Sequence, residues 1–172
     1  MIDGVTYKEL TPHGDVRGIF VEMWRQEWLP DGFAPVQGNR ADRGAGTVTG
    51  FHYHLHQADW WYVSRGRARL VLHDLRAGSS THGVTMSLDV DPDAGEHRGL
   101  YVPPGVAHAF AAITDITLVY LVDQYYNTAD ELGVAYDDPE LAIDWGIASP
   151  VVTPRDAGNA ALAAQREVRP FR

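Results

Sequence analysis

Short strand-like runs separated by turn residues fill the middle of the chain and limit its fold more than any other feature. Residues 67–75 (RARLVLHDL) alternate polar and apolar side chains, as a strand with one buried face does. Helical pattern is confined to residues 26–29 and 159–165. We therefore expect an all-β protein, an antiparallel sandwich or small barrel. The expected strands are residues 60–64, 67–75, 99–103, 108–113 and 116–122.

The length of the chain, 172 residues, is that of about one domain. No linker, internal repeat or low-complexity tract divides it. We expect N-terminal strands in residues 1–48, the barrel core in 49–123 and a C-terminal extension in 124–172.

Composition excludes several kinds of chemistry. There is no cysteine, so disulfides, zinc–thiolate sites and cysteine nucleophiles are excluded. A formal net charge of −9 argues against nucleic acid as a partner. Lys8 is the only lysine and falls in an expected N-terminal strand, which argues against Schiff-base chemistry. No apolar run approaches the ~20 residues that span a bilayer, and the first residues lack a signal-peptide pattern. We expect a cytoplasmic protein with no membrane partner.

Residues 50–59 read GFHYHLHQAD and place three histidines at alternate positions. In a strand, His52, His54 and His56 would project from the same face. Asp59 and the distant His108 add a carboxylate and a fourth imidazole. These residue types suit a divalent metal site, a catalytic base with its neighbours, or ordinary strand positions, and the pattern leaves all three open.

Two segments resemble the conserved motifs of the cupins. Gly-x-His-x-His followed by Asp59 and Gly66 resembles the first motif, with aspartate where cupins usually carry glutamate, and residues 103–108 (PPGVAH) resemble the second. Cupins are small jelly-roll β-barrels, and many hold Fe, Mn, Ni or Zn with three histidines and one carboxylate. Nitrogen and carboxylate-oxygen ligands suit such metals. A metal site of this kind would use His52, His54, Asp59 and His108.

A longer resemblance covers nearly the whole chain. Residues 15–22 (DVRGIFVE), 36–39 (VQGN) and 50–53 (GFHY) are similar to the D-x-RG-x-F-x-E, VQ-x-N and GLHYQ motifs of the dTDP-4-dehydrorhamnose 3,5-epimerase family. This family is a metal-free branch of the cupins that acts on nucleotide-linked 4-keto-6-deoxy sugars. The resemblance implies a homodimer that uses no cofactor. Further similar segments are residues 73–76, 79–83, 102–110, 125–126, 137–139, 141–145 and 153–156.

The same resemblance implies a role for individual residues. His52 would be the general base, Asp156 its orienting partner, and Tyr126 the acid that reprotonates the opposite face of the sugar. Neutral imidazole suits the removal of a proton alpha to a ketone, because its pKa lies near the working pH and a carboxylate on its other nitrogen fixes the tautomer. The substrate-binding positions would be Arg17, Glu22, Gln37, Asn39, His54, Asp59, His108 and Glu131.

Three residues depart from the family pattern inside the expected site. Thr49 stands where the family has an arginine, and Arg40 and Arg43 are the candidates to replace that arginine. His54 and Asp59 stand where the family has a glutamine and a lysine. Losing a cationic group beside a developing enolate oxygen lowers a rate by ~10²–10³.

Several ways of making up for this loss remain open. Protonated His54 or His56, paired with Asp59, would donate to the oxyanion. Alternatively, a divalent metal would act as a Lewis acid or activate oxygen, and a metal bound to His52 would exclude this histidine as the base. The His-x-His pair also resembles that of the sugar 3,4-ketoisomerases, and a binding protein without turnover is the remaining alternative. We expect epimerisation at C3, C5 or both.

Overall fold

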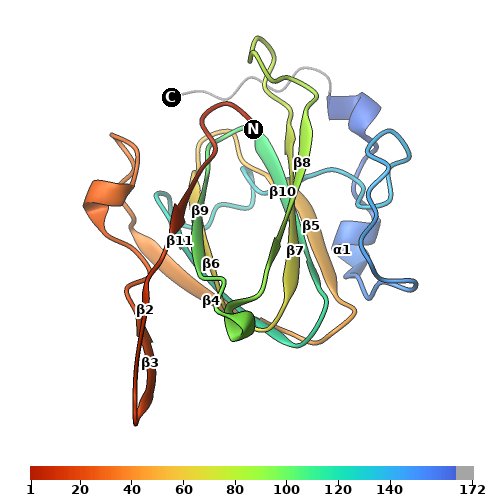
Figure 1. Cartoon of the computed structure of the whole chain (residues 1–172). Helices are drawn as coiled ribbons and strands as arrows, with labels where there is room; N and C mark the ends of the chain where they lie inside the picture. Colours follow the sequence, from red (N-terminus) through yellow and green to blue (C-terminus); the bar gives the residue numbers. More distant parts are fainter. Residues whose placement is uncertain (166–172) are drawn as a thin grey trace.

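The structure is a computed structural model that describes residues 1–165. Two antiparallel five-stranded sheets face each other and enclose the core (Figure 1). The strand order is β1-β9-β6-β11-β4 in the first sheet and β12-β5-β10-β7-β8 in the second. A separate hairpin of β2 and β3 projects from the body of the molecule (Figure 1).

The strands of the first sheet are β1 (Thr6–Glu9), β4 (Gln37–Arg43), β6 (Asp59–Arg65), β9 (Arg98–Val102) and β11 (Ile116–Val122). Those of the second are β5 (Val48–Tyr53), β7 (Ala68–Asp74), β8 (Thr85–Val90), β10 (Val106–Ala112) and β12 (Leu132–Gly133). The hairpin comprises β2 (Pro12–Asp15) and β3 (Gly18–Val21). The helical elements are η1 (Gln26–Trp28), η2 (Pro92–Ala94), α1 (Pro154–Ala157) and η3 (Leu162–Gln165).

The predicted all-β fold is confirmed, and the five expected strands correspond to β6, β7, β9, β10 and β11. Lys8 lies in strand β1, as expected, and residues 26–29 contain η1. The C-terminal helical segment is shorter than the expected residues 159–165, since η3 covers only Leu162–Gln165. A separate helical turn, α1, precedes it. None of the helices in residues 1–165 is long and apolar enough to cross a membrane.

The two sheets pack through apolar side chains, but the second sheet is covered on both faces. Between the sheets, Trp61, Leu100 and Phe110 belong to one buried cluster. On the outer face of the second sheet, segments after β11 add Leu141 and Trp145 to a second cluster. All seven residues of β10 are therefore buried, which explains why this strand reads as a continuous apolar run in the sequence.

A local irregularity in β5 lets the side chains of Thr49 and His52 line the same cavity. His52 pairs with His108 and Thr49 pairs with Phe110, so the strand carries an extra residue between these pairs, as a β-bulge does. Gly50 lies at this point with a φ of 102°. A Cβ there would meet the carbonyl oxygen of His108 at 2.6 Å, so only glycine fits.

The expectation that three histidines share one strand face is wrong for His56. Strand β5 ends at Tyr53, and the chain then turns. The carboxylate of Asp130 accepts hydrogen bonds from the backbone N–H groups of Leu55 (2.7 Å) and His56 (3.1 Å), which holds this turn in place. The His56 side chain is consequently exposed, whereas His54 stays buried.

Candidate active site

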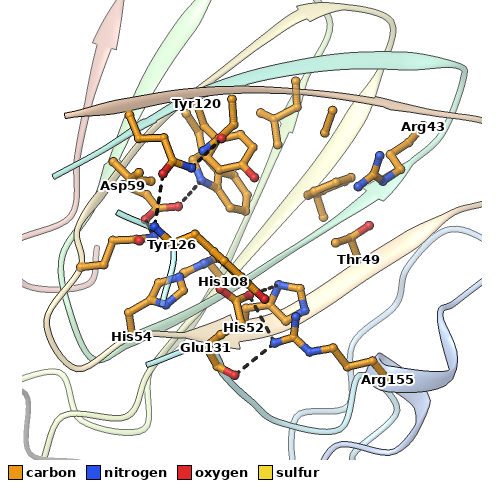
Figure 2. Close-up of a pocket in the computed structure, with 18 residues that line it drawn as sticks. Arg43, Thr49, His52, His54, Asp59, His108, Tyr120, Tyr126, Glu131 and Arg155 are labelled. Atoms are coloured by element: carbon orange, nitrogen blue, oxygen red, sulfur yellow. Dashed lines mark hydrogen bonds and ion pairs between the residues drawn. The ribbon is translucent and has the colours of Figure 1, made fainter. Parts of the chain in front are cut away.

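A cavity of about 390 Å³ opens into the barrel and collects most of the predicted site residues (Figure 2). Strand β4 shows how the fold lines it. Its alternate residues point inward, whereas Gly38, Arg40 and Asp42 between them are exposed. The full lining is Gln37, Asn39, Ala41, Arg43, Thr49, His52, His54, Gln57, Asp59, Trp61, His108, Phe110, Leu118, Tyr120, Val122, Tyr126, Glu131 and Arg155.

His52 and Asp156 form a hydrogen-bonded pair at the wall of this cavity. His52 Nε2 lies 2.7 Å from Asp156 Oδ1, and the Asp156 side chain is buried. Helix α1 holds the carboxylate in place, because Thr153 Oγ1 accepts the Asp156 N–H at 3.1 Å. The Gly50 N–H donates to Asp156 Oδ2 at 3.4 Å. The strand irregularity and the helix cap therefore converge on one imidazole–carboxylate pair.

The charges around this pair favour an ionised aspartate. Burial alone would raise the pKa of Asp156, but the hydrogen bond and the charge of His52 outweigh it and hold the pKa below its usual value. A carboxylate that accepts a hydrogen bond from Nε2 leaves Nδ1 of the neutral ring with the free lone pair. His52 Nδ1 lies 3.6 Å from Glu131 Oε1, too far for a hydrogen bond but close enough to stabilise an imidazolium.

Several further polar groups lie at the mouth of the cavity. Gln37 donates from Nε2 to Asn39 Oδ1 at 2.9 Å and accepts the Tyr126 backbone N–H at 3.2 Å. The Tyr126 side chain is exposed and lines the same cavity as His52. Arg155, which sequence reasoning did not single out, contacts Glu131 at 3.3 Å. The sequence places Arg155 in the family-like segment 153–156, but no role was assigned to it there.

Three further titratable groups meet in the same cavity, and all are buried: His54, Asp59 and His108. One potential metal-ligand atom from each lies within 4.8 Å of the other two. Asp59 accepts hydrogen bonds from Gln57 Nε2 (2.8 Å) and Trp61 Nε1 (2.9 Å). Burial lowers the pKa of His108 to about 4, against the opposing charge of Asp59. Of the four residues in the alternative metal set, these three meet, whereas His52 lies outside the group.

Comparison with known proteins decides the family. The profile of the dTDP-4-dehydrorhamnose 3,5-epimerase family matches residues 1–164. The chain belongs to this family. A dTDP-4-dehydrorhamnose 3-epimerase of Streptomyces niveus is 35% identical over 176 residues, which covers 96% of this chain and 83% of the relative. The spore coat polysaccharide biosynthesis protein SpsL of Bacillus subtilis is 36% identical over 150 residues, 84% of this chain and 97% of SpsL.

Solved structures of epimerases share the fold of this chain. NovW, a 4-keto-6-deoxy sugar epimerase from the novobiocin gene cluster of Streptomyces spheroides, aligns with a TM-score of 0.87 and 33% identity. The alignment covers 96% of this chain and 86% of NovW. RmlC of Legionella pneumophila, in complex with dTDP-4-keto-L-rhamnose, aligns with a TM-score of 0.88 and 28% identity over 99% of this chain and 95% of RmlC. The predicted family and the RmlC-like cupin fold are confirmed.

The structure distinguishes between the two arginines that the sequence offered in place of the family arginine at Thr49. Arg43 lines the cavity on the same side as Thr49 (Figure 2). Arg40 points away from the cavity and pairs with exposed Asp42 at 3.1 Å. Of these two arginines, Arg43 is the one that offers a cation in the cavity near Thr49.

The wall that carries Asp59 has become acidic compared with the family pattern, which has a lysine at this position. Burial, followed by the charges of Asp59 and Glu131, raises the pKa of Tyr120 in the same wall. The arginines that line the cavity, Arg43 and Arg155, appear in Figure 2 on the other side of the pocket from Asp59.

Two predicted substrate-binding residues lie outside the cavity. Arg17 is on the β2–β3 hairpin and pairs with Asp15 at 2.5 Å. Glu22 directly follows the hairpin and pairs with Arg25 at 2.7 Å. Neither lines the pocket of its own chain. The structure thus brings together Gln37, Asn39, His52, His54, Asp59, His108, Tyr126, Glu131 and Asp156, but not Arg17 or Glu22.

Proposed function

We propose that the protein epimerises a dTDP-linked 4-keto-6-deoxy sugar at C3, C5 or both. The observation that carries this proposal is the His52–Asp156 pair, which opens into a cavity that Tyr126 also lines. Family membership supports it, because several relatives are named as dTDP-4-dehydrorhamnose 3,5- or 3-epimerases. A nucleotide sugar as substrate also agrees with the expected cytoplasmic location.

In the proposed reaction, His52 Nδ1 removes the proton next to the C4 ketone. The electron pair of the broken C–H bond moves into the ring and leaves an enolate, with its charge on the C4 oxygen. Asp156 accepts the Nε2–H and stabilises the imidazolium, and Glu131 at 3.6 Å adds to this stabilisation. Tyr126 then donates its phenolic proton to the opposite face of the carbon, which inverts the centre.

The polar groups at the mouth of the cavity suit the nucleotide part of the substrate. We propose that Arg43 and Arg155 bind the diphosphate, since guanidinium groups bind phosphate oxygens through paired hydrogen bonds. Gln37 and Asn39, already bonded to each other, present amide groups to the nucleoside. Arg43 would then replace the family arginine, whose position Thr49 occupies in this chain.

The position of Arg17 and Glu22 supports a homodimer in which each hairpin completes the site of the other chain. The hairpin leaves Val16, Ile19 and Phe20 exposed, and Ile19 is 68% exposed. Apolar side chains on a projecting hairpin gain free energy when a second copy covers them. In such a dimer, Arg17 would reach the nucleotide of the partner.

Deuterium incorporation tests the reaction. The protein is incubated in D₂O with a dTDP-4-keto-6-deoxyhexose, and NMR follows C3 and C5. We expect deuterium at one or both carbons, and none after His52→Asn. Tyr126→Phe is expected to retain exchange but to lose epimer formation. A protein that binds dTDP and incorporates no deuterium would be a binding protein, and the proposal would fail.

Complementation tests the dimer. His52→Asn and Arg17→Ala chains, each inactive alone, are co-expressed. If the hairpin serves the partner's site, a mixed dimer contains one intact site, and about a quarter of wild-type activity returns. No recovery in verified mixed dimers would place Arg17 outside the partner's site.

A further inference from the structure

The buried cluster of His54, Asp59 and His108 is chemically distinct from the base side of the pocket. The three residues come from the turn after β5, from the start of β6 and from β10. Their candidate ligand atoms lie within 4.8 Å of one another, and all three side chains line the main cavity. The cluster therefore faces whatever occupies the pocket.

The hydrogen bonds of the two histidines determine which ring nitrogen keeps its lone pair. His54 Nδ1 lies 2.8 Å from the carbonyl oxygen of Asp130, and His108 Nδ1 lies 3.1 Å from that of Val106. A carbonyl oxygen only accepts, so each Nδ1 carries the hydrogen. In the neutral rings, each Nε2 then holds a free lone pair.

The cluster consequently presents electron-pair donors and no hydrogen between them. Asp59 receives hydrogen bonds from Gln57 and Trp61, which orient its carboxylate. Among residues 1–165, no hydrogen bond reaches Nε2 of His54 or His108. Two imidazole lone pairs and a buried carboxylate that converge need a proton or a metal cation between them.

We propose that His54, Asp59 and His108 bind one divalent transition-metal ion. Two imidazole nitrogens and one carboxylate oxygen are ligands that Zn²⁺, Fe²⁺, Mn²⁺ and Ni²⁺ accept. The supporting hydrogen bonds from Nδ1 to carbonyl oxygens are those that orient histidine ligands at metal sites. Three protein ligands leave coordination positions open toward the cavity, as in catalytic rather than structural sites.

A metal at this position does not compete with the base. His52 lies outside the cluster, and its Nε2 is bonded to Asp156 at 2.7 Å, so Nδ1 stays free to remove a proton. The role of the ion rests on the proposed function. It would polarise the C4 ketone from the wall where the family has a lysine and this chain has Asp59. The binding of the metal itself does not depend on that function.

Metal binding by the whole protein tests the site. The chain is purified without a histidine tag, treated with a chelator and titrated separately with Zn²⁺, Mn²⁺ and Co²⁺ by calorimetry. Bound Co²⁺ is also followed by its visible absorption. We expect one equivalent per chain, and a loss of affinity of roughly 100-fold or more in His54→Ala and in Asp59→Asn.

Two variants serve as controls. His56→Ala removes an exposed imidazole from the same segment, and His52→Asn removes the base; both should keep wild-type affinity. Circular dichroism verifies that each variant is folded, and His108→Gln provides a third ligand variant if one of the others does not fold.

The outcomes separate this proposal from the proposed function. No stoichiometric binding by wild-type protein, or unchanged affinity in all folded ligand variants, overturns the metal site and indicates that a shared proton holds the cluster. If the chelated protein still incorporates deuterium at the full rate, the epimerase proposal stands and the catalytic role of the metal is lost. If metal binds at these residues but no deuterium enters the sugar, the site stands and the epimerase proposal falls.

Discussion

Two groups of residues in the pocket, called its two walls below, differ in how closely they follow the family pattern. One contains His52 and Asp156, and the other contains His54, Asp59 and His108. One wall keeps a histidine bonded to a buried aspartate, with the tyrosine at the mouth. The other has His54 and Asp59 where the family pattern has a glutamine and a lysine, and it includes the buried His108 from the family-like segment 102–110. If the proposed function holds, the residues that remove a proton follow the family, whereas the group that stabilises the resulting charge is of another chemical kind. Proton abstraction and oxyanion stabilisation would then change separately within one barrel.

The largest effect is expected on the wall that follows the family. Replacing His52 with Asn removes the base, and deuterium exchange should fall by roughly 10³-fold or more. Asp156→Asn keeps the shape but disturbs the tautomer, and it should lose a large part of the same rate. Proton NMR in D₂O measures both. His56→Asn, at an exposed imidazole, is the matched control. Exchange that survives in His52→Asn would move the base to the other wall.

The next effect concerns the wall that departs from the family. Asp59→Asn retains a polar group of the same size, but it removes the charge that would hold a cation. With metal supplied, we expect kcat to fall ~100-fold while slow exchange continues through His52. Asp42→Asn, on the outer face of β4, should leave kcat unchanged. An undiminished rate in Asp59→Asn would mean that this wall takes no part in the reaction.

A smaller effect on catalysis is expected at Arg43, the proposed contact to the diphosphate of the nucleotide. Arg43→Ala should raise KM by roughly tenfold and leave kcat nearly unchanged, since a phosphate contact contributes to ground state and transition state alike. Arg40→Ala is the matched control, because Arg40 belongs to the same strand but points outward. Equal effects of the two substitutions would indicate general surface charge rather than a contact in the pocket.

The smallest effect on activity is expected far from both walls, at Asp74. Burial would raise the pKa of Asp74, but hydrogen bonds from Arg76, Ser79 and Thr81 outweigh it and hold the pKa well below its usual value. Because the pKa is depressed in the folded state, this stabilisation is complete above about pH 4 and is lost as the pH falls further.

Asp74→Asn should accordingly lower the free energy of unfolding at pH 7 by about 1–3 kcal/mol while sparing exchange at 25 °C. Urea titrations at pH 7 and pH 3 measure this difference, which should shrink at the lower pH. A difference that is the same at both pH values would contradict the assignment. Exchange rates lost along with stability would show that the walls of the pocket depend on this loop.

Much of the fold and most of the pocket could be predicted from the sequence. Turn residues and alternating side chains placed β6, β7, β9, β10 and β11, because local sterics and burial act over a few residues. Strand β8 was not singled out, although its residues (TMSLDV) alternate polar and apolar side chains. The β2–β3 hairpin carries no such alternation and was also missed. Most of the site residues selected by motif position also line the cavity.

The sequence could not determine which side chains meet across long separations. A strand continuing through His56 was a reasonable expectation, but the turn depends on Asp130, 74 residues away from His56. The choice between Arg40 and Arg43 depended on which face of β4 points inward. Likewise, only the positions of β5, β6 and β10 separate His52 from the three-residue cluster.

Helix α1 brings the carboxylate of Asp156 to a histidine 104 positions earlier in the chain. Every barrel strand is synthesised before this residue leaves the ribosome. A nascent or prematurely terminated polypeptide that ends after β11 would hold its imidazole without the acidic partner. Under the proposed function, turnover would begin only after α1 has packed against β5, and a product that ends after β11 would be inactive.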